Sequence, residues 1–334
     1  MSNTDNIKRV QLDLDLVKTQ NEDDLFYFVE SDTLKSERIT APRYSYWKSV
    51  FRIFFKKKIN WFILGFLFLL LFMSFVFPLI FKYNEFENVT LNPSAKDLSP
   101  IQAMNRFGFS IKWIFGTGTY GNSIFYGVWA AARTSLALGI ICALINMTIG
   151  ILVGAVWGYS KFLDAIFNVI YSIVANIPEI LLLAILVYVI GSGFGQFIFA
   201  LTILGWLGIA YFFRTQVLII RDREYNLASR CLGTNLFRVV RCNVLPYLVS
   251  VIVTIMATAI PSYIGSEVYL TYIGIGLSAE VPSLGHMIGD AQGTWTVNPW
   301  PFWVPVAVSA MLTIALYFVG QNLADASDPR SHMN

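Results

Sequence analysis

The sequence predicts an all-α integral membrane protein with six transmembrane helices and with both termini in the cytoplasm. Of its 334 residues, 56% are hydrophobic and only 13% are charged, whereas soluble domains carry nearer a quarter charged residues. Six apolar segments approach or exceed the roughly 20 helical residues that cross a bilayer. Lys and Arg gather in the loops on one side of these segments, and short basic loops stay in the cytoplasm. The net charge of +3 gives no indication of nucleic-acid binding.

The N-terminal part begins with a polar cytoplasmic segment over residues 1–45, followed by an amphipathic interfacial helix over residues 46–60. This helix places Trp47, Phe51, Phe54 and Phe55 on one face among basic residues. Such a pattern is typical of a helix that lies on anionic lipid, and a solvated linker is the alternative.

The membrane part begins with a first span over residues 61–81, and residues 82–132 are expected to be extracellular. A five-helix core with a cytoplasmic loop follows over residues 133–320, and residues 321–334 form a cytoplasmic tail. The expected spans of this core lie near residues 135–157, 165–190, 197–219, 247–272 and 303–319.

Residues 221–246 form the long polar and basic stretch between two of these spans. Its five arginines predict that the stretch faces the cytoplasm. Leu227, Cys231 and Leu232 recur at helical spacing before Gly233 interrupts the helix, and a second short helix is expected over residues 236–241. Two short helices joined at a glycine on the cytoplasmic side of a membrane could dock onto another protein, so we interpret residues 221–246 as a docking loop.

This loop resembles one in the permeases of binding-protein-dependent ABC importers, which reads E-A-A-x-x-x-G with L-P about a dozen residues later. Leu227-Ala228-Ser229 stands at the E-A-A position, so Leu227 replaces the motif glutamate, and Gly233 and Leu245-Pro246 stand at the other two. The flanking residues resemble the C-type permease of oligopeptide and dipeptide importers. The predicted docking loop consists of Arg223, Glu224, Tyr225, Leu227, Ala228, Ser229, Arg230, Leu232, Gly233, Leu245 and Pro246.

Two later segments extend this resemblance. Residues 267–277, EVYLTYIGIGL, are similar to the family's E-x-x-L-S-F-L-G-L-G, and residues 320–330 are similar to its ending L-G-D-G-L-R-D-x-L-D-P-R. The resemblance therefore covers residues 46–330. It implies the architecture of a type I ABC importer permease in the bacterial cell membrane.

Three glycines on the second span, Gly150, Gly154 and Gly158, recur every four residues. They form a ridge of small residues on which another helix can pack closely. We interpret this ridge as a packing surface and not as a gate.

Two carboxylates lie at membrane depth. Glu179 follows Pro178 near the middle of the expected third span, where a charge costs on the order of 3 kcal/mol on insertion scales. We hypothesise that Glu179 and Pro178 line a translocation pathway; a local hydrogen bond to the Val174 carbonyl, freed by Pro178, is the alternative. Glu267 lies near the outer end of the fifth span and is a second candidate for the pathway and its external gate, with an ordinary membrane-edge loop as the alternative.

For three other patterns we expect no nucleotide site, no metal site and no disulfide bond, respectively. Residues 116–121 match G-x-G-x-x-G, but no strand precedes them, so we expect no nucleotide site. His286 and Asp290 lie one helical turn apart in a chain with only two histidines, so we expect no metal site. The cysteines are expected to be reduced, and they are Cys142, Cys231 and Cys242.

The resemblance implies the permease subunit of an ATP-driven importer of peptides, oligopeptides in particular. It implies a second, B-type permease, two ATP-binding cassette subunits, an extracellular substrate-binding protein and membrane lipid as partners. ATP and Mg²⁺ would be bound by the ATPase subunits, with no catalytic residue and no cofactor in this chain. A related dipeptide or nickel importer is the alternative within the same class. A self-contained channel or secondary transporter is a second alternative, and it would predict an internal repeat or a filter motif. A membrane enzyme is a third alternative, and it would need clustered ionisable groups.

Overall fold

The computed structural model describes residues 45–80, 95–278 and 280–328. Within these ranges the regular structure is helical, apart from one isolated antiparallel bridge between Thr117 and Ser123. The expected segment 1–45 lies almost wholly outside the described residues, as do residues 81–94 of the expected extracellular segment and residues 329–334 of the tail.

Five helical stretches are long and apolar enough to cross a membrane. The first, Lys58–Ile80, combines α3 (Lys58–Leu71), the π-helical turn η2 (Phe72–Val76) and α4 (Phe77–Ile80). The third, Phe194–Ile220, combines α9 (Phe194–Ile203) and α10 (Gly205–Ile220). The others are α6 (Ile124–Tyr159), α14 (Val249–Tyr272) and α16 (Trp300–Ser327).

The expected third span, near residues 165–190, is broken into two helices. It consists of α7 (Lys161–Ala175) and α8 (Glu179–Ile190), which are bent by 88° relative to each other. Asn176 caps the end of α7, and Pro178 immediately precedes α8. The residue before a proline disfavours helical geometry and proline lacks an N–H, so an apolar segment of spanning length is divided into two short helices. Counted as one broken span, the pair brings the described residues to the six spans that we expected.

The central element is α6, which starts eleven residues before the expected span. The Ser123 hydroxyl accepts a hydrogen bond from the Tyr126 amide and caps its first turn. α10 packs along the Gly150, Gly154 and Gly158 face of α6. A Cβ added at Gly150 would lie 2.6 Å from Ile209, and one at Gly158 would lie 2.8 Å from the Arg214 carbonyl oxygen, so the glycines permit a close approach of the two backbones.

On another face of α6 lies the main apolar core, where α3, α6, α14 and α16 meet. Leu136, Ile264, Leu284 and Leu312 are fully buried there. Leu284 belongs to α15 (Leu284–Ala291), so this short helix is anchored into the same core.

The interfacial helix α2 (Tyr46–Lys56) packs against the end of α16. Val50 and Phe54 are buried beside Ala326, and the Tyr46 hydroxyl donates to the Ser327 carbonyl oxygen at 2.8 Å. Trp47 and Phe51 on the outer face remain exposed. Phe55 is exposed with them, but Phe54, which the sequence predicted on the same face, is instead buried because it packs beside Ala326.

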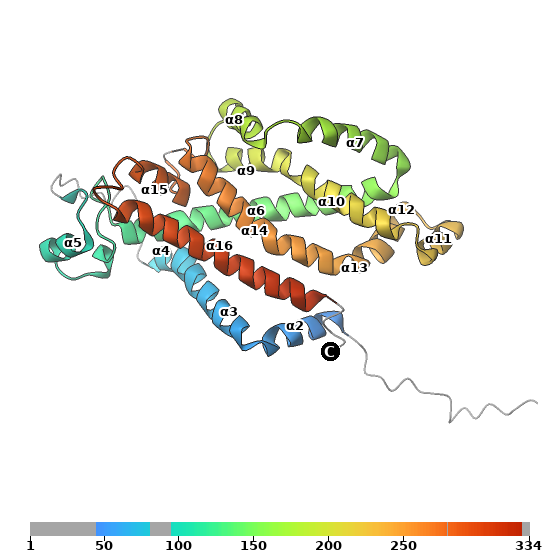
Figure 1. Cartoon of the computed structure of the whole chain (residues 1–334), viewed down its shortest axis with the longest axis horizontal. Coiled ribbons are helices and arrows are strands. Elements are labelled where there is room, and N and C mark those ends of the chain that lie inside the picture. The colour runs from blue at the N-terminus through green and yellow to red at the C-terminus, as the bar shows by residue number, and fades with distance from the viewer. Residues whose placement is uncertain (1–44, 81–94, 279, 329–334) are drawn as a thin grey trace, which may run out of the picture. The chain divides into compact units, whose positions relative to one another are not determined.

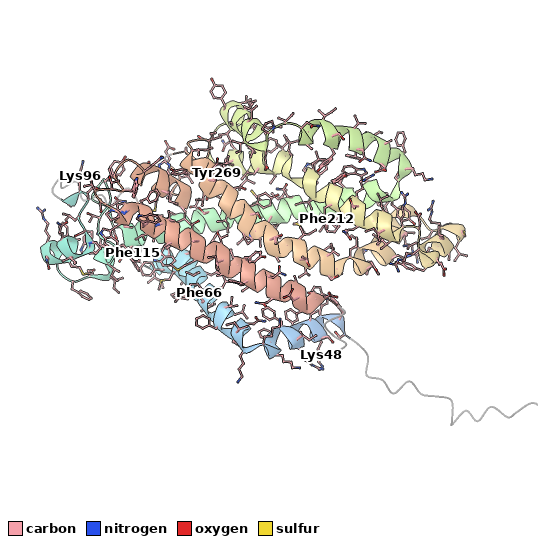
Figure 2. All side chains as sticks on the ribbon, in the orientation of Figure 1. Lys48, Phe66, Lys96, Phe115, Phe212 and Tyr269 are labelled. Atoms are coloured by element: carbon pink, nitrogen blue, oxygen red, sulfur yellow. The ribbon has the colours of Figure 1, made fainter. Side chains whose placement is uncertain are left out.

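The loops lie at opposite ends of the helical bundle (Figure 1). α11 (Glu224–Cys231) and α12 (Leu236–Val239) lie at one end, and α5 (Pro100–Phe107) lies at the other. Figure 2 shows Lys96 toward the end that holds α5, with Phe66 and Phe212 farther along the bundle. This arrangement suits an apolar middle within a bilayer and polar ends in water.

Candidate functional site

The polar loop forms two short helical segments joined by a sharp turn. α11 starts after Arg223, with Glu224 as its first residue, which is favourable because a carboxylate interacts well with a helix N-terminus. Gly233 has a φ of +75°, a backbone conformation that glycine adopts readily. The expected second helix is longer than predicted, because α12 continues through the π-helical η5 (Val240–Val244) into α13 (Leu245–Tyr247).

A buried asparagine anchors α11 to the membrane helices. Asn226 is fully buried, and its side-chain amide donates to the Ile220 carbonyl oxygen at 2.8 Å, at the end of α10. The Asn243 amide donates to Asn226 Oδ1 at 3.1 Å and to the Ser229 hydroxyl at 3.2 Å. Asn226 therefore joins the end of α10, α11 and η5 in one hydrogen-bonded unit.

The arginines of the loop contact the ends of the neighbouring helices. Arg221 donates to the Gly158 carbonyl oxygen at 3.2 Å, at the end of α6. The Arg230 guanidinium lies 5.7 Å from the centre of the Tyr159 ring, and that of Arg223 lies 5.7 Å from the Tyr247 ring. These are cation–π distances, so the basic residues also fix the base of the loop.

The outer surface of α11 and the turn that follows it carries large apolar side chains among charged ones such as Glu224 and Arg230. Leu232 is 86% exposed and Phe237, just beyond the glycine turn, is 68% exposed. Neighbouring exposed residues with apolar side chains are Tyr225, Leu227 and Ala228. Leu245, by contrast, packs against a buried cluster at the base of the loop. Exposed apolar side chains grouped on a polar loop mark an interaction site.

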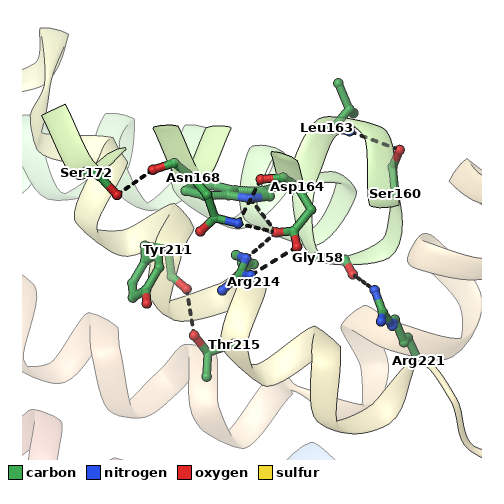
Figure 3. Close-up of polar contacts among 11 residues, drawn as sticks. Gly158, Ser160, Leu163, Asp164, Asn168, Ser172, Tyr211, Arg214, Thr215 and Arg221 are labelled. Atoms are coloured by element: carbon green, nitrogen blue, oxygen red, sulfur yellow. Dashed lines mark hydrogen bonds and ion pairs between the residues drawn. The ribbon is translucent and has the colours of Figure 1, made fainter. Parts of the chain in front are cut away.

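An ion pair links α7 to α10 within the bundle (Figure 3). The Arg214 guanidinium contacts both carboxylate oxygens of Asp164, one through Nε and the other through Nη2 at 3.0 Å. The Trp157 indole N–H and the Asn168 side-chain amide each donate to the same carboxylate at 2.9 Å. Both charged side chains are partly buried, where such partners stabilise them, and the site ties α6, α7 and α10 together.

Sequence reasoning missed Asp164 and Asn226. For Asp164 a signal was present, because opposite charges at positions 164 and 214 each interrupt an otherwise apolar segment. Asn226 is an ordinary polar residue in a polar loop, and no pattern distinguished it.

The elbow between α7 and α8 opens onto a cavity of about 470 Å³. Pro178 and Glu179 line it, together with residues of α9 and α10. The Val174 carbonyl oxygen accepts from the Ile177 amide at 3.0 Å. The alternative in which Pro178 leaves this carbonyl free is therefore wrong, and Glu179 begins α8 with its side chain exposed.

Glu267 occupies a different environment from Glu179. It is fully buried, and its carboxylate accepts from the Thr271 hydroxyl at 3.2 Å. The hydroxyls of Ser135 and Ser283 lie around the same carboxyl, and Ser135 also accepts from the Leu284 amide at 3.2 Å. The structure thus places Glu267 inside the bundle, among residues of α6 and α14 and the N-terminal cap of α15, and its assignment to the pathway stays a prediction.

The remaining patterns are engaged in local structure. The Thr117 hydroxyl of the glycine-rich segment donates to the Ala95 carbonyl oxygen at 2.6 Å and accepts from the Leu98 amide at 2.9 Å. His286 Nε2 lies 3.3 Å from Asp290 Oδ2. In the part of the chain that the structure describes, no group of three or more His, Cys, Asp or Glu side chains converges on a metal position.

Comparison with protein families decides the class of this chain. Residues 135–332 match the family described as "binding-protein-dependent transport system inner membrane component". The chain belongs to this family of transport permeases. Residues 45–100 of the permease also match the "N-terminal TM domain of oligopeptide transport permease C". The predicted family is confirmed, and the chain is a multi-pass transport subunit of the bacterial cell membrane.

Individual relatives match this permease over nearly their whole length. The oligopeptide transport system permease protein AmiD of Streptococcus pneumoniae is 43% identical over 92% of this chain and 97% of its own. The dipeptide transport system permease protein DppC of Bacillus subtilis is 31% identical over 92% of this chain and 93% of its own. The inward-facing MetNI methionine ABC transporter has a TM-score of 0.48 at 21% identity, covering 61% of this chain and 95% of the matched chain.

Proposed function

We propose that this chain is one transmembrane half of an ATP-driven importer that takes up peptides, oligopeptides in particular. A B-type permease would supply the other half, and an extracellular binding protein would deliver the peptide. Two ATP-binding cassette subunits would bind ATP and Mg²⁺, and this chain would hold neither. The relative at 43% identity, whose name specifies oligopeptides, supports this substrate class. The relative at 31% supports a dipeptide importer as the second candidate.

The observation that carries the proposal is the group of exposed apolar side chains on α11, the turn after it and α12. Leu232, Leu227 and Phe237 are exposed at the end of the bundle where α11 lies. Burying such side chains in a groove of an ATPase stabilises the complex by about 25 cal/mol per Å² of apolar surface. With α11 and the other basic loops on the cytoplasmic side, both termini would also lie there.

The internal contacts supply a route from α11 to the membrane helices. Asn226 joins α11 to the end of α10, and Arg214 of α10 pairs with Asp164 of α7. A displacement of α11 by the ATPases would therefore move α10 and α7 with it. These two helices border the cavity that contains Glu179, so the force would reach the pathway.

Purification of the intact chain from its native membrane in mild detergent, with mass spectrometry of the bound proteins, tests this proposal. We expect a second six-span permease and ATPases with Walker motifs. Leu232→Asp should remove the ATPases and retain the second permease. Phe109→Asp is the matched control, because Phe109 is 87% exposed and lies outside the α11–α12 loop. Recovery of the chain alone, or equal loss of ATPases in both variants, would contradict the docking assignment.

A further inference from the structure

The elbow at residues 176–178 places a carboxylate and a helix end beside the same cavity. α7 runs toward the elbow and ends at Ala175, and α8 begins at Glu179. The C-terminal end of an α-helix carries partial negative charge from its unsatisfied carbonyl groups. Ala175 and Glu179 both line the cavity, so the end of α7 and the carboxylate add negative potential beside the N-terminus of α8, which carries partial positive charge.

The rest of the cavity is largely apolar. Its walls include Val174, Leu183 and Leu201, and Glu179 provides the only formal charge among its lining residues. A volume of about 470 Å³ lies in the range of small-molecule sites, roughly 300–1,000 Å³. The Tyr171 ring also lines the cavity and is held by stacking on Tyr211, with ring centres 4.1 Å apart.

Glu179 has no ion-pair partner among the described residues. Asp164, by contrast, forms an ion pair with Arg214 and accepts hydrogen bonds from two further side chains. A carboxylate at membrane depth is costly and by default faces a cavity or pairs with a cation. Glu179 is exposed on the cavity wall, so its carboxylate is accessible to a cationic ligand that enters the cavity.

We propose that Glu179 binds the α-ammonium group of a peptide as the peptide passes through this cavity. This inference rests on the proposed function. Every peptide with a free N-terminus carries this cation, whereas its side chains vary. One carboxylate in an apolar cavity therefore holds the common group and accepts different side chains beside it. The Tyr171 ring can contribute a cation–π contact to the same ammonium.

The test uses the complete importer in proteoliposomes, with tetraalanine supplied on its binding protein at saturation. Glu179→Gln removes the charge and retains the shape, and we expect the uptake rate to fall by roughly 10- to 100-fold, the range of hydrogen bonds to charged groups. Glu179→Asp should restore most of the rate. Glu280→Gln, which neutralises an exposed carboxylate between α14 and α15, should leave uptake unchanged.

A labelling experiment separates binding from transport. Cys231 and Cys242 are exposed and are replaced by serine, and Ala175→Cys then provides a thiol at the cavity wall. We expect tetraalanine to protect this thiol from a methanethiosulfonate reagent and N-acetyl-tetraalanine to protect it at least tenfold less well. Glu179→Gln should abolish this difference.

The outcomes distinguish the two proposals. If the wild-type importer takes up no peptide, the proposed function fails and the inference falls with it. If the wild type imports tetraalanine and Glu179→Gln imports it at the same rate, or if both peptides protect Ala175→Cys equally, the ammonium site is wrong while the proposed function stands.

Discussion

Replacing Gly154 by alanine is expected to destabilise the packing of α6 against α10 by about 1–3 kcal/mol, the usual range for overpacking. A Cβ at this position would lie 2.8 Å from Phe213 Cβ and 2.9 Å from Ala210 Cα, and closer still to the Ala210 carbonyl oxygen. Carbon atoms prefer separations of about 3.5–4.0 Å, so α10 would have to withdraw by roughly 1 Å.

That withdrawal is resisted on both sides of Gly154. Gly150 and Gly158 hold α10 in equally close contact one turn away in each direction. Two of the three atoms that the new methyl group meets belong to the α10 backbone, and a backbone cannot rotate aside as a flexible side chain can. The cost should therefore fall at the upper end of the range.

Thermal unfolding of the purified importer in detergent measures this effect, and Gly208→Ala is the matched control. Gly208 lies on α10, and a Cβ there would meet no atom within 4 Å. Alanine favours a helix over glycine by up to about 1 kcal/mol, so this variant should match or exceed the wild-type stability. A Gly154→Ala protein as stable as the wild type, or equal losses in both variants, would refute the close-packed ridge.

Three further predictions concern the route from the loop to the membrane helices. Asp164→Ala leaves the largely buried Arg214 guanidinium unpaired and should cost about 3 kcal/mol, seen as earlier thermal unfolding; Asp164→Asn also removes the charge but retains an acceptor for the Trp157 indole and should cost less, and an Asp164→Asn protein as stable as the wild type would argue against the ion pair. Asn226→Ala removes the side-chain amide that donates to the Ile220 carbonyl oxygen and should lower peptide uptake per ATP hydrolysed. An unchanged ratio of uptake to hydrolysis would show that the contact between α11 and α10 does not couple the ATPases to transport. Gly233→Asp should likewise uncouple hydrolysis from uptake, because a φ of +75° disfavours a side chain by about 1–2 kcal/mol; normal coupling in this variant would contradict the docking role of α11.

Much of this fold was predictable because membrane helices are specified by local composition. A bilayer requires long apolar helices, so hydropathy alone located the spans now seen as α6, α14 and α16. The period of four at Gly150, Gly154 and Gly158 indicated one helical face, and Gly233 indicated a turn. These features depend on neighbouring residues in the chain.

The features that sequence reasoning missed depend on the angle between successive helices and on contacts between residues far apart in the sequence. Hydropathy averages composition over a window and does not report a bend, so α7 and α8 were expected as one span, and the 88° bend between them was not predicted. The pairing of Asp164 with Arg214 joins residues 50 positions apart. Likewise, the burial of Glu267 depends on α15 returning to pack beside α6 and α14, and only the folded chain brings these elements together.

ATP-dependent uptake of a radiolabelled oligopeptide by proteoliposomes that contain the complete importer tests the central claim most directly. The account predicts uptake that requires ATP and the binding protein, that persists without an ion gradient, and that is lost in Leu232→Asp. Uptake that proceeds without ATP, or that follows an imposed ion gradient, would identify a self-contained channel or secondary transporter and contradict the account.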